Sequence, residues 1–376
     1  MMDALLVPGA GMNSLLVADN GASPVLVSQL RTAAIVPALS QVLDVFDGGL
    51  GNALWDNFGK PALDIDFAGT QSLIDRVSGQ NLTTFTRSTT KTYIGPSGTF
   101  ETAAINTCPL IYDPVTLRCL GIQPEPGTRV NLLLNTDTLS GQSLSVTAQS
   151  YTLSFYGTGT VTLSGAATAT ATGTGAFPTR TILTFTPTAG TLTLTVSGSV
   201  RFAQLEARNW ATTYMPSTSS QGTCGAENLF IGGTNFSNIY NSSTPTTVYV
   251  EAIPTTAIVN GTFFSLNDGT TANRATVRNA TGTNFLALMQ SAAVTDGQPG
   301  IIGALTNGVP FKGSFVIRNG GTFANVYYNG ATGTADTSFS IPAYSRLAIG
   351  GELAASGHII SRIVVWNKEL GASVTA

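Results

Sequence analysis

Short stretches in which apolar and polar residues alternate dominate this chain. Residues 63–67 read Leu-Asp-Ile-Asp-Phe, a period of two that predicts a half-buried β-strand. Over residues 131–216 and again over 236–376, runs rich in Thr, Val, Leu and Phe are interrupted by Gly and Pro every eight to twelve residues. That rhythm is typical of β-sandwiches. We therefore expect an all-β protein with tandem β-sandwich (jelly-roll) domains.

The last third of the chain carries the clearest strand signals. Asn329-Gly330 is a dipeptide that tolerates positive φ angles and predicts a hairpin turn. Seven strands are predicted there, at residues 247–253, 261–266, 284–289, 311–317, 323–328, 346–349 and 358–366.

The N-terminal block has a different pattern. Between residues 25 and 46 the apolar positions recur at mixed spacing, which predicts a helix, and Pro37 makes two short helices as acceptable as one kinked helix. Gly48-Gly49 would end it. A block this apolar needs a surface to cover it, so we expect a small, partly helical segment for attachment or oligomerisation.

The changes in pattern predict five regions. They are an N-terminal attachment segment (1–62), a β-rich connecting segment (63–130), a jelly roll (131–216), a Ser/Thr/Gly-rich linker (217–235) and a second sandwich (236–376).

Composition narrows the function. Among 376 residues there are 1 His and 3 Cys, and 10% of the chain is charged, so side chains for acid–base, nucleophilic or metal chemistry are scarce. We expect a structural or binding protein, no enzyme activity and no cofactor. The net charge of -3 argues against nucleic-acid binding. The lack of an 18-residue apolar stretch argues against membrane insertion, and the lack of a basic N-terminal region before an apolar run argues against a secretion signal.

The cysteines leave two alternatives open. Cys108 and Cys119 flank a turn signal, Tyr112-Asp113-Pro114, so they could face each other across a hairpin as a disulfide. Buried free thiols are the more common arrangement for such residues.

A series of short motifs runs through residues 63–216. They are Asp-Phe-Ala-Gly at 66–69, Phe-Thr-Arg-Ser at 85–88, Tyr93, Tyr-Asp-Pro at 112–114, Gly121, Glu-Pro at 125–126, Asn-Leu-Leu-Leu-Asn at 131–135, Phe-Ala-Gln-Leu-Glu at 202–206 and Ala-Thr-Thr-Tyr-Met-Pro at 211–216. In this order they resemble a segment of tailed-bacteriophage virion proteins that leads into a jelly roll similar to carbohydrate-binding modules. The resemblance implies a virion protein, assembled in the host cytoplasm, whose N-terminal part attaches it to the particle.

Residues 347–351 and 357–370 are similar to the closing strands of the concanavalin A-like or laminin-G-like sandwich. Through these segments the C-terminal third of the chain resembles that fold. Together the two resemblances imply a tail appendage, such as a fibre, a spike-like or a minor tail protein, that adheres to the host surface. A capsid decoration or head-fibre protein is the alternative. Other virion proteins, sister subunits (with a trimer favoured) and a host-surface glycan are the expected partners.

Candidate ligand residues are few. Because sugar rings stack on exposed aromatic rings, the sugar-site candidates are Tyr327, Tyr328 and the turn residue Asn329, since alternation should turn one of the two tyrosine rings outward beside the turn. Laminin-G-like sandwiches can hold Ca²⁺ through loop oxygens, and Asp268 is a weak candidate ligand.

An enzyme that degrades glycans remains the alternative from another functional class. It requires two converging carboxylates, for which Asp64 and Asp66 on one strand face are the candidates. A solvated strand face is the simpler interpretation of that pair. His358, the single histidine, is expected to be an ordinary strand residue.

Overall fold

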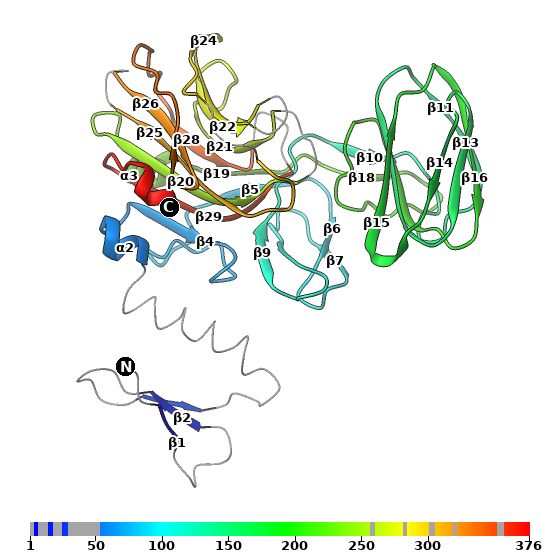
Figure 1. The fold of residues 1–376 in the computed structure, drawn as a ribbon, viewed down its shortest axis with the longest axis horizontal. Coiled ribbons are helices and arrows are strands. Elements are labelled where there is room, and N and C mark those ends of the chain that lie inside the picture. The colour runs from blue at the N-terminus through cyan, green and yellow to red at the C-terminus, as the bar shows by residue number, and fades with distance from the viewer. Residues whose placement is uncertain are drawn as a thin grey trace. The chain divides into compact units, whose positions relative to one another are not determined.

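The computed structural model describes residues 53–255, 260–280, 284–300, 305–318, 322–351 and 357–376, and three strands nearer the N-terminus. The chain divides into two compact units, Met1–Asn57 and Phe58–Ala376. The described residues form antiparallel β-sheets with a few short helices, which confirms the all-β prediction (Figure 1). Within this described part, no helix is both long and apolar enough to cross a membrane.

The first unit contains a three-stranded antiparallel sheet formed by β1 (Ala4–Leu6), β2 (Ser14–Val17) and β3 (Val25–Ser28). β3 occupies the start of the region 25–46, so the helix prediction is wrong for these four residues. Val-Leu-Val-Ser is rich in β-branched residues, which favour a strand when a sheet partner is present. The rest of that region lies outside the described residues. A short helix, α2 (Ala53–Phe58), follows it.

The second unit is built on a large sandwich of two sheets. The seven-stranded sheet has the order β24 (Val294–Gly297), β23 (Phe285–Ser291), β22 (Arg274–Asn279), β21 (Thr262–Asn267), β28 (Arg346–Ile349), β19 (Asn228–Gly232), β5 (Thr84–Thr86). The eight-stranded sheet has the order β27 (Ala331–Thr332), β26 (Ala324–Tyr328), β25 (Phe311–Ile317), β20 (Thr246–Ile253), β29 (Ile359–Trp366), β9 (Cys119–Ile122), β8 (Leu110–Tyr112), with β4 (Leu63–Asp66) also paired to β29.

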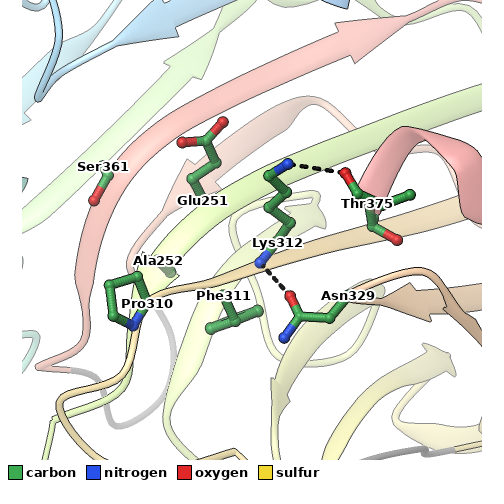
Figure 2. Close-up of a pocket in the computed structure, with 9 residues that line it drawn as sticks. Glu251, Ala252, Pro310, Phe311, Lys312, Asn329, Ser361 and Thr375 are labelled. Atoms are coloured by element: carbon green, nitrogen blue, oxygen red, sulfur yellow. Dashed lines mark hydrogen bonds between the residues drawn. The ribbon is translucent and has the colours of Figure 1, made fainter.

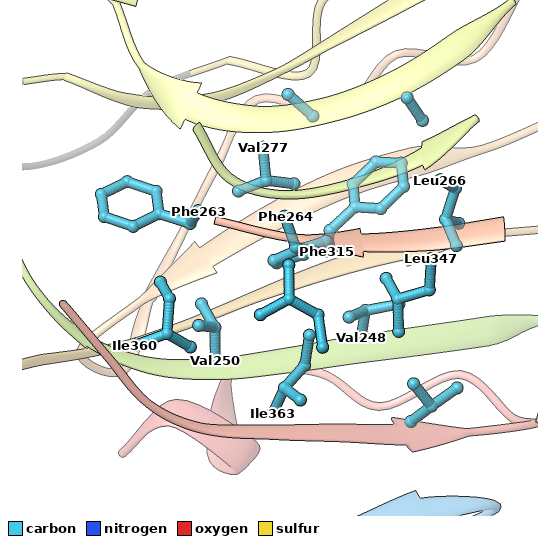
Figure 3. Packing of buried hydrophobic residues seen from close by; sticks show 14 of the residues in the cluster. Val248, Val250, Phe263, Phe264, Leu266, Val277, Phe315, Leu347, Ile360 and Ile363 are labelled. Atoms are coloured by element: carbon cyan, nitrogen blue, oxygen red, sulfur yellow. The ribbon is translucent and has the colours of Figure 1, made fainter. Parts of the chain in front are cut away.

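The core of this sandwich lies between the two sheets. Alternate residues of the eight-stranded sheet, among them Val250, Phe315 and Ile363, point toward Phe264 and Leu347 of the facing sheet (Figure 3). All five side chains are fully buried. Each large apolar side chain contributes roughly 1.5–3 kcal/mol when it is buried. Because successive side chains of a strand point to opposite faces, the residues between these core positions lie on the outer face of the sheet.

The seven strands predicted in the last third are all present, within two residues at each end. The segment 217–235 is not a linker: it holds β18 (Gly222–Cys224) and β19, and helix α3 (Gly233–Ile239) begins within it. β19 pairs with β28 and β5 inside the seven-stranded sheet. Four strands of the segment 63–130, namely β4, β5, β8 and β9, also belong to the sheets of this sandwich.

A second, smaller sandwich is inserted between these parts, where a jelly roll was predicted. The chain enters it through β10 (Arg129–Asn131) and leaves it through β18, which pairs with β10. Its buried core includes Leu153, Phe155 and Leu192. One sheet has the order β11 (Gln142–Val146), β16 (Gly190–Ser197), β13 (Thr160–Gly165), β14 (Ala169–Thr172), and the other β15 (Gly175–Phe185), β12 (Tyr151–Gly157), β17 (Arg201–Glu206).

A buried ionic cluster lies where the inserted sandwich joins the larger one. Lys91 Nζ lies 2.6 Å from Glu227 Oε2 and 3.1 Å from Glu125 Oε2. Arg87 pairs with Glu227, and Arg129 lies 3.4 Å from Glu125. Burial opposes ionisation of Glu125, but Arg129 and Lys91 outweigh it and lower the pKa of that carboxyl. The side chains come from both ends of the insertion, so the cluster holds its entry and exit together.

A two-stranded hairpin, β6 (Lys91–Ile94) and β7 (Phe100–Ala103), contacts the inserted sandwich. Phe100 packs with its ring centroid 4.9 Å from that of Phe177, and 5.2 and 5.3 Å from those of Phe202 and Tyr214. Glu125 also accepts hydrogen bonds from the amide and hydroxyl of Thr213 (3.0 and 2.6 Å). Apolar and polar contacts therefore both fix the joint.

Candidate functional site

A row of charged side chains crosses the outer face of the eight-stranded sheet. The strand registers place Lys312 of β25 opposite Glu251 of β20, Glu251 opposite Arg362 of β29, and Arg362 opposite Asp66 of β4. Since the neighbouring positions on each strand face the core, these four side chains share the other face. The charges alternate in sign along the row, so each cross-strand pair joins opposite charges. Such pairs stabilise this register of the strands.

Polar contacts orient the row. Arg362 donates to both carboxylate oxygens of Asp64, over 2.9 and 2.7 Å. Tyr249 Oη donates to Glu251 Oε1 (2.8 Å), which holds that carboxylate in place. Burial raises the pKa of Asp66, with the Arg362 guanidinium acting in the opposite direction. These groups sit on paired strands, which hold a site more rigidly than loops do.

A pocket of about 400 Å³ opens at the Lys312 end of the row (Figure 2). Between Glu251 and Ala252 the pairing of β20 with β29 contains a β-bulge, and the extra residue, Ser361, lines the pocket beside Glu251. Asn329 lines the opposite side, where its Oδ1 accepts a hydrogen bond from the Lys312 amide (2.9 Å). The 3-10 helix η3 (Ala372–Thr375) and Ala376 close one edge.

The pocket combines donors and acceptors within a small space. Lys312 Nζ donates to the main-chain oxygen of Ala376 (2.9 Å) and keeps two further hydrogens for a ligand. Glu251 offers a carboxylate oxygen, Ser361 a hydroxyl and Asn329 an amide group. This set suits a ligand with several hydroxyl groups, each of which both donates and accepts.

The three sequence-predicted sugar-site residues lie at this end of the sheet, but their roles differ from the expectation. Tyr327 is 7% exposed, and Tyr328 is half-buried against Phe285 and Phe311, so neither ring projects freely from the surface. Asn329 has φ +43 at the predicted turn. Of the three, Asn329 alone lines the pocket.

Asp268 uses its carboxylate within its own turn. Its Oδ1 accepts from the Thr270 amide and hydroxyl, and its Oδ2 accepts from Asn273. These hydrogen bonds lower the pKa of the carboxyl. In the part of the chain that the structure describes, no group of three or more His, Cys, Asp or Glu side chains is placed to hold a metal ion.

Asp64 does not lie on a solvated strand face, so that interpretation is wrong. Its carboxylate is fully buried, because Arg362 pairs with it on β29 and Arg76 Nη1 lies 3.7 Å from it. Asp66 is half-buried and its Oδ1 accepts from the Gly69 amide (2.7 Å).

His358 is a buried strand-end residue. Its ring stacks on Phe263 with centroids 4.5 Å apart, Nδ1 accepts from the Thr255 amide (3.3 Å) and Nε2 lies 3.3 Å from Asn279 Oδ1. Burial lowers the pKa of His358 to about 4, so the ring is neutral at physiological pH.

The three cysteines are free thiols, which settles the alternative left open by the sequence. Cys119 is paired in register with Tyr112, whereas Cys108 precedes β8, so the two are not opposite each other. Burial raises the pKa of Cys108 to about 12.

Sequence reasoning missed Glu251, Lys312 and Ser361. The period of two in β20 and β25 places Glu251 and Lys312 on the outer face of their strands. The sequence does not show that β20 and β25 are neighbours, or in which register they pair; only the tertiary structure does. The bulge that brings Ser361 to the pocket has no local sequence signal.

Comparison with solved structures gives distant likenesses to carbohydrate-binding modules, sialidases and a pentraxin. No protein-family model and no curated protein sequence matches the chain. The sialidase carbohydrate-binding module CBM40 of Ruminococcus gnavus, bound to α2,3-sialyllactose, is similar at 14% identity and a TM-score of 0.31, over 35% of this chain and 83% of that one.

Two other solved structures give similar values. Domain 4 of AbnA, an extracellular GH43 arabinanase of Geobacillus stearothermophilus in complex with arabinotriose, shows 14% identity, covers 45% and 82% of the two chains and has a TM-score of 0.33. The heptameric SAP-like pentraxin of Limulus polyphemus shows 17% identity, 35% and 69% coverage and a TM-score of 0.28. Likenesses of this size carry no inference about ligand or activity.

Proposed function

We propose that this chain is a non-catalytic, saccharide-binding component of a bacteriophage virion, and specifically part of a tail appendage that adheres to the host surface. The observation that carries the binding role is the pocket formed by Glu251, Lys312, Asn329 and Ser361 on the outer face of the eight-stranded sheet. The virion role is supported by the resemblance of residues 63–216 to bacteriophage virion proteins.

The chemistry of the pocket supports a saccharide. A carboxylate, an ammonium, a hydroxyl and an amide meet within about 400 Å³, which is within the usual size range of small-ligand sites. The carboxylate is held by Tyr249, and the ammonium is carried by a paired strand, so a ligand meets groups that are already in place. Adhesion by such a shallow site gains strength from several copies in an oligomer, for which a trimer is favoured.

The binding role is tested with the full-length protein, presented as a multimer on an array of host-surface glycans. Glu251→Gln and Lys312→Ala should each reduce retention roughly 10- to 150-fold, because a charged hydrogen-bond partner contributes roughly 1.5–3 kcal/mol. Lys60→Ala, which removes an exposed ammonium outside the pocket, is the matched control and should bind as the wild type does. Equal binding by all four proteins would contradict the assignment of this pocket.

The non-catalytic role has its own support and its own test. Asp64 is paired with Arg362, and Asp66 accepts a hydrogen bond from the Gly69 amide, so both candidate carboxylates have structural partners. His358 is buried in a stack on Phe263. We expect no release of reducing ends from host polysaccharide. Release that disappears when one Asp or Glu is changed would overturn this part of the proposal.

The location in the virion is tested by labelling. A gold-tagged antibody against the inserted sandwich should bind at the tail of the particle in electron micrographs. Label on the head would indicate a decoration or head-fibre protein, and particles without label, from cells that make the protein, would contradict a virion role.

A further inference from the structure

A second hollow lies elsewhere on the larger sandwich, away from the pocket over Glu251. It measures about 790 Å³ and is lined by the β6–β7 hairpin, by residues that lead into and form β8, and by the loop after β4. We call it the tyrosine groove, after Tyr93 of β6 and Tyr112 of β8, which line it together with Glu101, Gln71 and Asn81.

Both tyrosines are held in place by their hydroxyl groups. Tyr93 Oη donates to Glu101 Oε2 (3.1 Å), and Tyr112 Oη donates to Gln71 Oε1 (3.1 Å). Both rings are half-buried, so part of each ring surface remains open to the groove. A ring that is already fixed loses little conformational entropy when a ligand packs on it.

Gln71 is positioned by an unusual backbone. It has φ +50, in the left-handed region that non-glycine residues rarely adopt, and its side chain is exposed at the groove. Strained residues of this kind concentrate at binding sites. Because its carbonyl oxygen accepts from Tyr112, its amide NH₂ is the part that can donate to a ligand.

The remaining polar groups of the groove indicate which ligand charge it favours. Asn81 Oδ1 accepts from the Thr83 amide and hydroxyl (2.9 and 2.7 Å), which leaves its NH₂ to donate. Glu101 is the one residue among those lining the groove that carries a charge at neutral pH, and no Lys, Arg or His lines it. The groove therefore suits a neutral or positively charged ligand and disfavours an acidic one.

We propose that the tyrosine groove is a second saccharide-binding site, for a neutral or amino-bearing sugar chain. Two fixed rings provide apolar faces, and amide donors and a carboxylate acceptor provide partners for ring hydroxyls. The groove has nearly twice the volume of the first pocket, so it accommodates a longer segment of chain. This site uses none of the residues of the first pocket, and it stands or falls independently of the proposed function.

The test uses the full chain carrying Glu251→Gln and Lys312→Ala, so that the first pocket does not contribute. Calorimetry compares three probes of equal length: cellotetraose, which is neutral, the tetramer of glucosamine, which carries amino groups, and tetragalacturonic acid. The neutral or the amino probe should bind, and the acid should not. Tyr93→Ala and Tyr112→Ala should each weaken binding roughly two- to ten-fold, as expected for loss of an aromatic contact.

Two further variants separate binding from folding. Tyr112→Phe keeps the ring and should retain most of the affinity, while Val115→Ala, at an exposed position outside the groove, should change nothing. If an alanine variant does not fold, as judged by its thermal transition, the leucine variants decide: Tyr93→Leu and Tyr112→Leu keep an apolar side chain but remove the flat ring, and each should weaken binding by a similar factor.

Three outcomes would overturn the proposal. They are preferential binding of tetragalacturonic acid, binding that is unchanged in folded variants that lack a tyrosine ring, and the absence of binding by both other probes at roughly 10 mM, ten times the dissociation constant of a weak site.

Discussion

At the scale of single residues, several of the few charged side chains of this chain form buried ion pairs. Asp64, Glu125, Glu227, Arg87 and Arg129 are each at most 2% exposed. Removing one partner of such a pair leaves an uncompensated charge in the interior, which costs far more than the loss of a surface ion pair. A low content of charged residues therefore does not mean that charge is unimportant to this fold.

Asp64→Asn is predicted to destabilise the protein strongly. It leaves the Arg362 guanidinium, which is 11% exposed, without its carboxylate, and should lower the free energy of unfolding by about 3 kcal/mol. Asp137→Asn, which breaks the exposed pair with Arg201, is the matched control and should cost less than about 1 kcal/mol. Chemical denaturation measures the free energy of unfolding of both variants. Equal losses would contradict the prediction that the buried Asp64–Arg362 pair is costlier to break than the exposed pair.

His358 predicts a defined pH dependence of stability. The pKa of His358 is about 4 in the folded protein against an ordinary value of 6.5, so below pH 6.5 the unfolded chain takes up a proton that the folded chain does not. The free energy of unfolding should thus fall as the pH decreases from 6.5 to 4, by roughly 3 kcal/mol in all.

His358→Phe removes this titration while keeping a ring against Phe263. Its free energy of unfolding should be lower than that of the wild type at pH 7, because the Thr255 amide loses an acceptor, and should depend less on pH between 6.5 and 4. Thermal unfolding over that range distinguishes the two, and parallel curves would show that His358 does not carry the pH dependence.

At the scale of elements, the outer face of the eight-stranded sheet depends on how β29 is aligned with its neighbours. The bulge at Ser361 and the close approach of β9 to β29 together set the residues that reach the pocket. Gly121 of β9 has φ +116, and an added Cβ would lie 2.1 Å from the carbonyl oxygen of Ile360. A side chain there must displace β9 or β29.

Gly121→Ala is predicted to cost roughly 2–4 kcal/mol of stability and to weaken ligand binding at the Glu251 pocket, since the strand carrying Ser361 would shift. Gly127→Ala is the control: its φ is +88, but an added Cβ meets nothing within 4 Å, so only the backbone penalty of about 1 kcal/mol applies. Similar effects of the two changes on both stability and binding would contradict the role given to the β9–β29 contact.

At the scale of the second compact unit, the two sandwiches are joined by more than the two chain crossings. The ionic cluster around Lys91 and the aromatic contacts of Phe100 both connect the hairpin β6–β7 to the insertion or to its ends. We expect the two sandwiches to unfold in one cooperative transition.

Phe100→Ala should separate that transition into two. Phe100 belongs to neither hydrophobic core, so its removal should leave both cores intact and weaken the joint by roughly 2 kcal/mol. Ile105→Ala, at a 54% exposed position on the same segment, is the control and should change stability by less than about 0.5 kcal/mol. Scanning calorimetry that shows one unchanged transition for Phe100→Ala would contradict this coupling.

The sequence by itself determined the fold class and most strands of the two sandwiches, because period-two alternation and Gly/Pro punctuation are local signals. It located Phe311–Ile317 and Arg346–Ile349 to the residue. It also placed the Asn329-Gly330 turn, since positive φ requires such residues. It did not find β22, whose Arg, Thr and Asn residues weaken the apolar pattern, or β19, whose neighbours resemble a linker in composition.

Only the tertiary structure decided which strands are neighbours and therefore where the sites lie. β4 pairs with β29 almost three hundred residues later, and this pairing converts Asp64 from an expected surface residue into a buried partner of Arg362. The Glu251 pocket and the tyrosine groove combine side chains from strands and loops that are distant in sequence. Alternation gives the face on which a side chain lies, but the register and order of strands result from packing of the whole core, and no local pattern encodes them.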